Sequence, residues 1–338
     1  MAATGISIIS PDQSWPSEWF EHIGACLLCG SADCAPLLDG VQDWFFGAVP
    51  GAFGFARCRD CGSLLLERRP DAAHIGLAYA KYYTHAGAQA PAPPSGLVRR
   101  IGHDLAQGYA RRRYGGGRGA LDAVRAGLFA LFPVRRGEVD ATHRHLPPAP
   151  AEVLDYGCGN GAFLARAAGF GHLVSGVEFD AAAAAVARQG GVAVYDPVSL
   201  PEAAFAGRFD LITAVHVIEH VADPVALLGD FRRWLKPGGR VFLEMPNAEA
   251  GGLARHGRFW RGLEAPRHFS LPSVRGLAIA IERAGFEPVR IGRRAFARQF
   301  MDAASAEAAA AHPHISSGAG NIRHADGPEI ITFLASLR

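Results

Sequence analysis

The stretch VLDYGCGNG, residues 153–161, decides the fold of this chain. Four residues typical of a buried strand lead into three glycines at alternate positions, and an alanine-rich segment with helical character follows. Because glycine has no Cβ, such a loop lets the backbone approach a ligand that lies across the ends of the strands. A strand, a glycine loop and a helix in this order indicate the nucleotide-binding crevice of an α/β sheet.

Strands and helices alternate on the carboxyl-terminal side of this stretch. Such alternation predicts a parallel sheet that is covered by helices on both faces. A last helix is expected to start near Ser270 and to end at Gly285, and Glu329–Leu337 is predicted as a terminal strand. The segment between them, 302–326, is rich in Ala, Ser, Gly and His and is a candidate mobile tail. The other predicted strands are 153–156, 173–177, 209–215 and 240–245, and the predicted helices are 162–168, 181–189 and 224–235.

The glycine loop by itself leaves the ligand open. Gly157-x-Gly159-x-x-Ala162 also satisfies the dinucleotide fingerprint G-x-G-x-x-G/A. Glu178, which lies 21 residues after Gly157, suits the ribose hydroxyls of either a dinucleotide or another nucleoside ligand. A nicotinamide-dependent oxidoreductase is therefore an alternative that the loop alone allows.

Four of the six cysteines form two C-x2-C-G units, Cys26/Cys29 and Cys58/Cys61. Each unit aims two sulfurs at one point, so two units supply the four thiolates of a closed, structural Zn²⁺ site. A module of about 50 residues is too small for a sufficient core, so a metal is physically expected. Disulfides are the alternative, and Cys34 is expected to be a small buried hydrophobe.

Composition points to a globular protein that is expected to be soluble and cytoplasmic. The 338 residues are 49% hydrophobic and 20% charged, with a net charge of +2. This charge argues against nucleic acid as a partner, and the longest uncharged apolar-looking run is too short to span a membrane. Composition and a Pro-rich boundary divide the chain into a zinc-binding ribbon (1–70), a helical linker (71–148) and a main domain (149–338). Within the linker, helices are predicted from Leu97 to Arg113 and around 121–132, and segment 86–96 reads as a Pro/Ala/Gly linker.

Further motifs follow the glycine loop in a fixed order. They are Gly176-Val-Glu178, Phe209-Asp-Leu-Ile212, His216-Val-Ile-Glu-His220 and Leu235-Lys-Pro-Gly-Gly239. Together with the loop, they resemble the class I S-adenosylmethionine-dependent methyltransferases. Within this family the chain is similar to bacterial members that carry an amino-terminal zinc module and are associated with sugar or polysaccharide modification. The resemblance implies a Rossmann-like, doubly wound, mostly parallel seven-stranded sheet.

The resemblance also implies roles for individual residues. The glycines shape the pocket for the methionyl part of S-adenosylmethionine, Asp155 organises their loop, and Glu178 accepts hydrogen bonds from the ribose. Backbone near His216 would hold the methionyl amine. For Asp155 and Asp196, ordinary turn capping is the structural alternative. The expected cofactor residues are Asp155, Gly157, Gly159, Gly161, Glu178, Phe179, Asp196, Val198 and His216.

Transfer of a methyl group to an oxygen or carbon requires that the acceptor lose a proton, so a base is useful. The candidate catalytic residues are His216, Glu219, His220 and His268, with His220 and His268 as the leading bases. His216-x-x-Glu219-His220 also spells the inverted zinc-protease motif H-x-x-E-H. That motif requires a helix, whereas here it directly follows a predicted strand, so a catalytic metal is disfavoured.

The sequence therefore predicts an enzyme that methylates an oxygen or carbon of a small hydroxylated acceptor, such as a sugar, a nucleotide-linked sugar or another glycan precursor. Besides the oxidoreductase, a zinc-ribbon module that binds nucleic acid on a degenerate methyltransferase fold is an alternative. The nucleic-acid alternative is disfavoured because the sequence has no stripe of interleaved aromatic and basic residues. The Asn/Asp-Pro-Pro-Tyr motif of amine methylation is absent where Ala214-Val-His216-Val217 stands.

Overall fold

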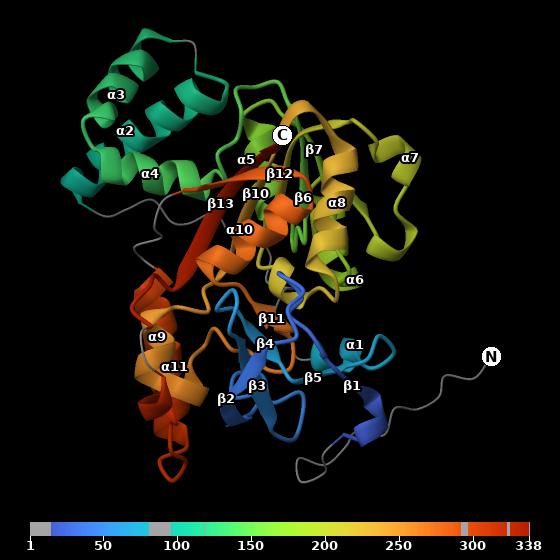
Figure 1. The fold of residues 1–338 in the computed structure, drawn as a ribbon. Coiled ribbons are helices and arrows are strands. Elements are labelled where there is room, and N and C mark those ends of the chain that lie inside the picture. Colours follow the sequence, from blue (N-terminus) through green and yellow to red (C-terminus); the bar gives the residue numbers. More distant parts are fainter. Residues whose placement is uncertain (1–14, 81–95, 118, 292–296, 323–324, 338) are drawn as a thin grey trace.

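The computed structural model describes residues 15–80, 96–117, 119–291, 297–322 and 325–337. Its centre is a seven-stranded sheet in the order β12-β13-β10-β9-β6-β7-β8 (Figure 1). Five neighbouring strands run parallel, while β13 pairs antiparallel with both β10 and β12. This is the predicted mostly parallel, Rossmann-like sheet. Its strands are β6 (Glu152–Tyr156), β7 (Leu173–Val177), β8 (Ala193–Tyr195), β9 (Phe209–Val215), β10 (Leu235–Pro246), β12 (Phe286–Arg290) and β13 (Ile330–Leu337).

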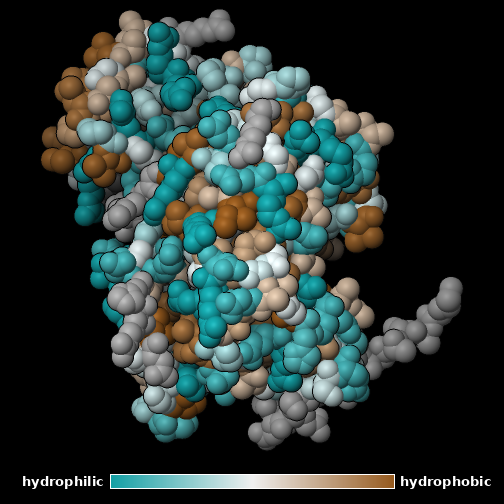
Figure 2. Space-filling view, viewed as in Figure 1, coloured by the Kyte–Doolittle hydropathy of each residue, from teal (hydrophilic) through white to brown (hydrophobic). Residues whose placement is uncertain are grey.

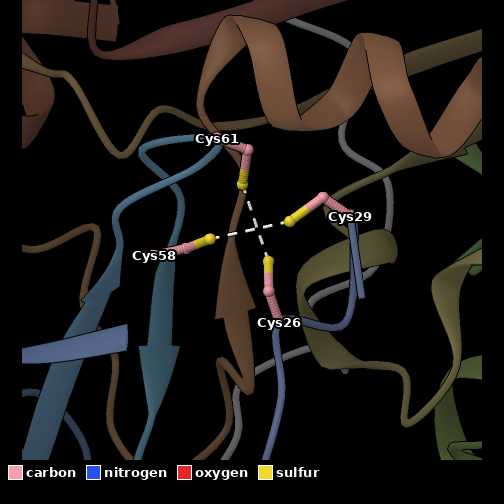
Figure 3. A group of neighbouring side chains, drawn as sticks. All are labelled: Cys26, Cys29, Cys58 and Cys61. Atoms are coloured by element: carbon pink, nitrogen blue, oxygen red, sulfur yellow. Dashed lines mark hydrogen bonds between the residues drawn. The ribbon is translucent and has the colours of Figure 1, made fainter. Parts of the chain in front are cut away.

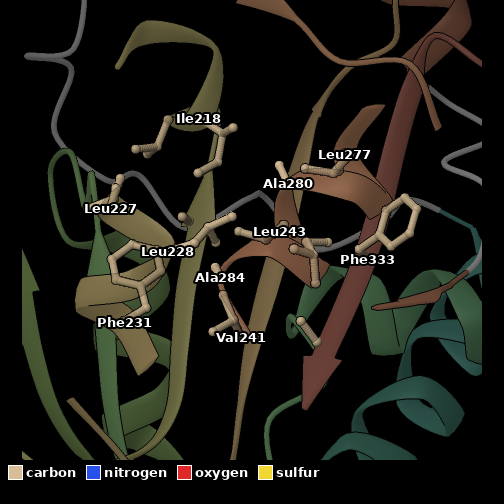
Figure 4. Close-up of a cluster of buried hydrophobic side chains, with 14 of the residues drawn as sticks. Ile218, Leu227, Leu228, Phe231, Val241, Leu243, Leu277, Ala280, Ala284 and Phe333 are labelled. Atoms are coloured by element: carbon tan, nitrogen blue, oxygen red, sulfur yellow. The ribbon is translucent and has the colours of Figure 1, made fainter. Parts of the chain in front are cut away.

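Helices cover both faces of this sheet because successive strand residues point to opposite sides. On one face, Leu243 and its neighbours pack against α8 (Pro224–Trp234) and α10 (Val274–Arg283), as Figure 4 shows. On the other face, Phe242 belongs to the cluster that includes α5 (Ala162–Gly169) and α6 (Ala181–Gln189). The carboxyl ends of the parallel strands therefore meet along one edge, where a doubly wound sheet binds its ligand.

A second, four-stranded antiparallel sheet has the order β11-β4-β3-β2. Three of its strands come from the amino-terminal region: β2 (Cys34–Val41), β3 (Phe53–Cys58) and β4 (Leu64–Leu66). The fourth, β11 (Ser270–Leu271), comes from the methyltransferase-like region and pairs with β4. A two-stranded ribbon of β1 (Phe20–His22) and β5 (Arg68–Pro70) completes this part of the chain. The expected boundaries at residues 70 and 148 stay predictions, but the two parts share a sheet.

The linker region contains three consecutive helices that pack on one another, seen at the upper left of Figure 1. They are α2 (Leu97–Tyr114), α3 (Ala120–Ala130) and α4 (Pro133–Thr142). Many large apolar side chains here remain exposed, and Figure 2 shows them as a brown area over α2 and α3. Most of segment 86–96 lies outside the described residues, as do Tyr82 and Tyr83, two aromatic residues that the sequence makes candidates for the mouth of the ligand pocket.

Two expectations about the carboxyl-terminal part were wrong. The predicted last helix is α10, which starts at Val274 and not near Ser270, because Ser273 caps it and residues 270–271 pair with β4; a further helix, α11 (Ala297–Ala311), follows it. Residues 302–311 do not form a mobile tail but belong to α11. This helix is held by the Arg255–Asp302 ion pair at 2.6 Å.

The remaining elements are short. None of the helices within the described residues is long and apolar enough to cross a membrane. The short elements are α1 (Ile75–Ala78), α7 (Glu202–Phe205), α9 (Gly251–His256) and the 3-10 turns η1 (Ser17–Trp19), η2 (Pro197–Ser199), η3 (Ile218–His220), η4 (Gly257–Phe259) and η5 (Ala319–Asn321).

Candidate active site

The three glycines of the loop after β6 all have positive φ angles, but they differ in what surrounds them. A Cβ on Gly157 would lie 2.6 Å from Val217, and one on Gly161 would lie 2.8 Å from the Cβ of Ala187. A Cβ on Gly159 would meet no atom within 4 Å. The first and third glycines are therefore required by packing, whereas the second faces open space on the side where a cofactor would lie.

Glu178 lies directly after β7, as the sequence predicts for a ribose-binding acid. Its carboxylate accepts hydrogen bonds from the backbone N–H groups of Gly159 at 2.7 Å and Asp180 at 2.9 Å. Burial raises the pKa of Glu178, and the backbone donors oppose that rise. A carboxylate has about four lone-pair positions, so this one can still accept from the hydroxyls of a ribose. It also ties the end of β7 to the glycine loop.

The candidates beside the adenine follow the carboxyl ends of β7 and β8, close in sequence to Glu178 or to the end of β8. Phe179 is 56% exposed, and its ring meets that of Tyr79 edge-on at 5.0 Å. Val198 is 94% exposed, which is unusual for an apolar residue and leaves it available to a flat ligand. The carboxylate of Asp196 accepts from Val198 N at 2.8 Å, so it caps η2. Capping is thus the contact that the structure assigns to Asp196.

Asp155 is buried, and its contacts differ from the expected ones. Its carboxylate accepts hydrogen bonds from Thr213 Oγ1 at 2.7 Å and from the Arg144 guanidinium, rather than from the glycine loop. Burial raises the pKa of Asp155, while Arg144 acts in the opposite direction. Asp155 therefore joins β6 to β9 and to the turn after α4. Sequence reasoning missed Arg144, because no local pattern links it to a carboxylate 11 residues away.

The end of β9 places His216 beside a buried carboxylate. His216 has a left-handed backbone (φ 55°) where the chain leaves the strand, and its side chain is 47% exposed. Its Nδ1 lies 3.2 Å from Oε1 of Glu219, which is completely buried in η3. Burial opposes a positive charge on the imidazole, but the Glu219 carboxylate outweighs this and raises the pKa of His216. The pair resembles the arrangement in which a carboxylate orients a general base.

His220 and His268 lie next to each other, as the sequence hypothesis requires. Their ring centroids are 4.6 Å apart, although the two histidines are 48 residues apart in the chain. Nδ1 of His220 lies 3.0 Å from the carbonyl oxygen of Arg267, and Nδ1 of His268 lies 2.8 Å from that of Gly262. Burial lowers the pKa of both histidines, that of His268 to about 4. Burial therefore disfavours the positively charged form of both imidazoles.

A buried ion-pair network holds the segment that carries His268. Arg267 has no exposed surface and donates to the carboxylates of Asp43 and Glu264 and to the carbonyl oxygen of Ala78. Burial disfavours the charge on Glu264, but His268, Arg261 and Arg267 together hold its pKa at about 2. Sequence reasoning missed this network, since Asp43 and Arg267 are 224 residues apart.

These groups open into a cavity of about 520 Å³. It lies at the carboxyl edge of β9 and β10 and is bounded on its outer side by residues of α4 and α11. Polar and apolar groups share the lining, as in small-molecule sites generally. The cavity is lined by Glu138, Thr142, His216, His220, Glu244, Pro246, Arg261, Glu264, His268, Ala297, Phe300, Met301 and Ile330.

The four cysteines Cys26, Cys29, Cys58 and Cys61 converge on one point, as Figure 3 shows. Their sulfurs all lie within 4.8 Å of one another, with 3.6 Å between Cys26 and Cys61 and between Cys29 and Cys58. Zn–S bonds of about 2.3 Å in a tetrahedron place sulfurs about 3.8 Å apart, so the arrangement fits Zn²⁺. Both turns close in the same way, with glycine N–H groups bonded to the carbonyl oxygens of Cys26 and Cys58.

The cysteine site is attached to helix α10 of the methyltransferase-like region. Ser63 Oγ lies 3.2 Å from the Cys61 sulfur and accepts from the backbone N–H of Ser273 at 3.1 Å. A Cβ on Gly276 would lie 2.0 Å from Ser63 Oγ and 3.2 Å from the Cys61 sulfur, so the helix approaches closely because it carries a glycine there. Cys34 is outside the cluster and contacts the carbonyl oxygen of Ser31.

Known proteins resemble the region around the glycine loop. Residues 134–291 match a family model described as "Methyltransferase domain". This part of the chain is therefore similar to methyltransferase domains. The match includes the glycine loop, Glu178 and all four candidate catalytic residues.

Two curated relatives share sequence with part of this chain. A ubiquinone biosynthesis O-methyltransferase of Thiobacillus denitrificans is 38% identical over 130 residues, which are 36% of this chain and 55% of that protein. The enzyme of the same name from Xanthomonas axonopodis pv. citri is 37% identical over 140 residues, or 39% of this chain and 57% of that protein. The chain thus spans about half the length of these relatives.

Solved structures are more distant. An S-adenosylmethionine-dependent methyltransferase from Mesorhizobium loti has a TM-score of 0.43 and 20% identity, covering 59% of this chain and 97% of that one. The YcgJ protein of Bacillus subtilis has a TM-score of 0.44 and 17% identity, covering 60% of this chain and 99% of that one.

Proposed function

We propose that this protein transfers a methyl group from S-adenosylmethionine to a hydroxyl oxygen of a small acceptor. The observation that carries the proposal is the juxtaposition of two sites on one sheet edge. The open face of Gly159 beside Glu178 suits the cofactor, and the cavity that contains His216 suits an acceptor. The family match and the names of the curated relatives support this reaction class.

For the cofactor, the residues present fit the group that the family implies. Glu178 would accept from the ribose hydroxyls, Phe179 and Val198 would lie against the adenine, and the carboxyl end of β9 would hold the methionyl part. When bound, S-adenosylmethionine would supply a methyl group on a sulfonium: an oxygen lone pair would form a bond to the methyl carbon while the C–S bond breaks and S-adenosylhomocysteine leaves. Close contact between the two reactants is the main catalytic requirement of such a displacement.

For the acceptor, we propose that His216 removes the hydroxyl proton at its Nε2. Nδ1 of His216 faces Glu219, which leaves Nε2 for the cavity. His220 and His268, which the sequence hypothesis ranked first, are more buried and have lowered pKa values, so they are weaker bases. In this proposal Glu219 orients His216 and stabilises its protonated form.

The acceptor class has two candidates. The sequence resemblance suggests a sugar or glycan precursor, and the curated relatives are named ubiquinone biosynthesis O-methyltransferases, which favours a hydroxyl oxygen of a ubiquinone precursor. The test is mass-spectrometric detection of a product 14 Da heavier after incubation with S-adenosylmethionine and a panel of catechols, nucleotide sugars and free sugars. Methylation of any hydroxyl in the panel supports the proposal, and product found only on amines would contradict it.

The proposed cofactor position predicts the effect of a side chain at residue 159. Asparagine tolerates left-handed backbone, so Gly159→Asn should fill the open space without strain. We expect S-adenosylmethionine binding to weaken more than about tenfold, or 1.4 kcal/mol. Calorimetry measures this.

Gly191→Asn is the matched control for that variant. Gly191 also has a left-handed backbone (φ 82°) and open space around its Cβ, but it lies before β8, at the opposite end of the strands. It should bind S-adenosylmethionine like the unaltered protein. Equal affinities of the two variants would place the cofactor elsewhere.

We also propose a structural Zn²⁺ at Cys26, Cys29, Cys58 and Cys61, supported by the tetrahedral fit of the sulfurs. All four positions are taken by protein ligands, so such an ion stabilises the fold and does no chemistry.

A further inference from the structure

A second group of potential metal ligands adjoins the acceptor cavity, which two of its members, His220 and His268, line. Glu219, His220 and His268 each offer an atom, and these atoms all lie within 4.8 Å of one another. Glu219 and His220 come from η3 after β9, whereas His268 comes from the loop before β11. The sequence motif H-x-x-E-H pointed to His216 and His220 as a pair, but His216 is not a member of this group.

Backbone carbonyls lie beside Nδ1 of both imidazoles. Nδ1 of His268 lies 2.8 Å from Gly262 O, and Nδ1 of His220 lies 3.0 Å from Arg267 O and 2.9 Å from the hydroxyl of Tyr79. Because a carbonyl oxygen can only accept, a proton on Nδ1 satisfies both carbonyl contacts and leaves the lone pair on Nε2. An Nδ1–H bonded to a backbone carbonyl is the usual second contact of a histidine that binds a metal through Nε2.

Glu219 provides the independent observation. It is completely buried, and its Oε2 has no hydrogen-bond partner among the described residues, although Oε1 contacts His216. The pKa of Glu219 is lowered, because contact with His216 and the nearby His220 outweighs the effect of burial. A buried carboxylate oxygen without a donor is unfavourable unless a cation or another donor reaches it.

We propose that Glu219, His220 and His268 bind a divalent transition metal ion in the acceptor cavity. Two imidazoles and one carboxylate suit Zn²⁺, Fe²⁺ or Co²⁺ better than Mg²⁺ or Ca²⁺, which favour oxygen ligands. Three protein ligands leave positions open to the cavity, where a hydroxyl oxygen of the acceptor can bind.

This inference deepens the proposed function and rests on it only for the role of the ion. A bound metal ion lowers the pKa of a coordinated hydroxyl, so it would make the proton easier for His216 to accept. The lone pairs of His220 and His268 then serve as ligands. If the ion is absent, the proposed methyl transfer can still take place with His216 alone.

The test measures metal content and needs no acceptor. The full chain is loaded with Co²⁺, dialysed and analysed for metal per protein, and the expected result is two equivalents in the unaltered protein. Glu219→Gln and His268→Gln should each hold one equivalent. The control is His103→Gln, an exposed histidine on α2 far from the cavity group in the sequence, and it should hold two. Equal metal content in the unaltered protein and both cavity variants would overturn the proposal.

A spectroscopic measurement on the unaltered protein covers the case in which a variant fails to fold. The X-ray absorption fine structure of cobalt in the cysteine cluster alone contains only sulfur scattering. The second site adds nitrogen and oxygen neighbours and the outer-shell scattering of imidazole rings. A spectrum with sulfur scattering alone would contradict the metal site in the cavity. The product assay tests the proposed methyl transfer separately, so the two proposals can fail independently.

Discussion

Cys58→Ser should remove the metal from the amino-terminal module and unfold that module. Structural Zn²⁺ contributes about 10–16 kcal/mol to the folding of small zinc domains, which is as large as the whole stability of a typical domain. Unfolding of the module should also disturb the loop that carries His268, because β11 pairs with β4 and Arg267 donates to Asp43. We therefore expect loss of acceptor methylation together with loss of metal, measured by elemental analysis, circular dichroism and product assay.

S-Adenosylmethionine binding should survive in Cys58→Ser, because the glycine loop and Glu178 belong to the seven-stranded sheet. Cys34→Ser is the matched control: Cys34 pairs with Cys58 across β2 and β3, yet its sulfur is outside the cluster. It should retain metal and activity. A Cys58→Ser protein with full metal content, or a Cys34→Ser protein without metal, would show that the ligand set is wrong.

His216→Asn should lower kcat by about 10²–10⁴, the range expected for loss of a general base. Asparagine is chosen because the backbone at this position is left-handed, which it tolerates. The affinity for S-adenosylmethionine should change less than about threefold, since the side chain faces the acceptor cavity. Initial rates with the best acceptor of the panel, together with calorimetry, measure the two quantities.

The control for His216→Asn is His103→Gln on α2, which should leave kcat unchanged. A kcat for His216→Asn within about threefold of the unaltered value would mean that catalysis depends on positioning alone. A large drop in His220→Asn with no drop in His216→Asn would return the role of base to the residue that the sequence ranked first.

The strands and helices around the glycine loop could be predicted because they are long, apolar and regularly spaced. β9 has the predicted bounds, and β6, β7 and α6 agree within one residue. β8 has only three residues, too few for a period, and β12 contains Pro288, which an edge strand tolerates. α11 was missed although its alanines are strong helix formers, because the Ser, Gly and His residues that follow it made the whole segment resemble a tail.

Some residues of the candidate site could likewise be predicted from the sequence, and others could not. The cysteines, the glycines, Glu178 and His216 belong to local motifs, so the sequence alone points to them. Contacts between distant residues left no local signal, as with Arg144 and Asp155 or with Arg267 and Asp43. The grouping of His268 with Glu219 depends on how the loop before β11 folds over the strand ends, which spacing cannot reveal.

The central claim, that the glycine loop binds S-adenosylmethionine, is tested most directly by calorimetric titration of the unaltered protein. Separate titrations use S-adenosylmethionine, S-adenosylhomocysteine and NAD. We predict saturable binding of one equivalent of each of the first two and no heat of binding with NAD. Binding of NAD without binding of either sulfur compound would contradict the account and favour the oxidoreductase that the loop alone allows.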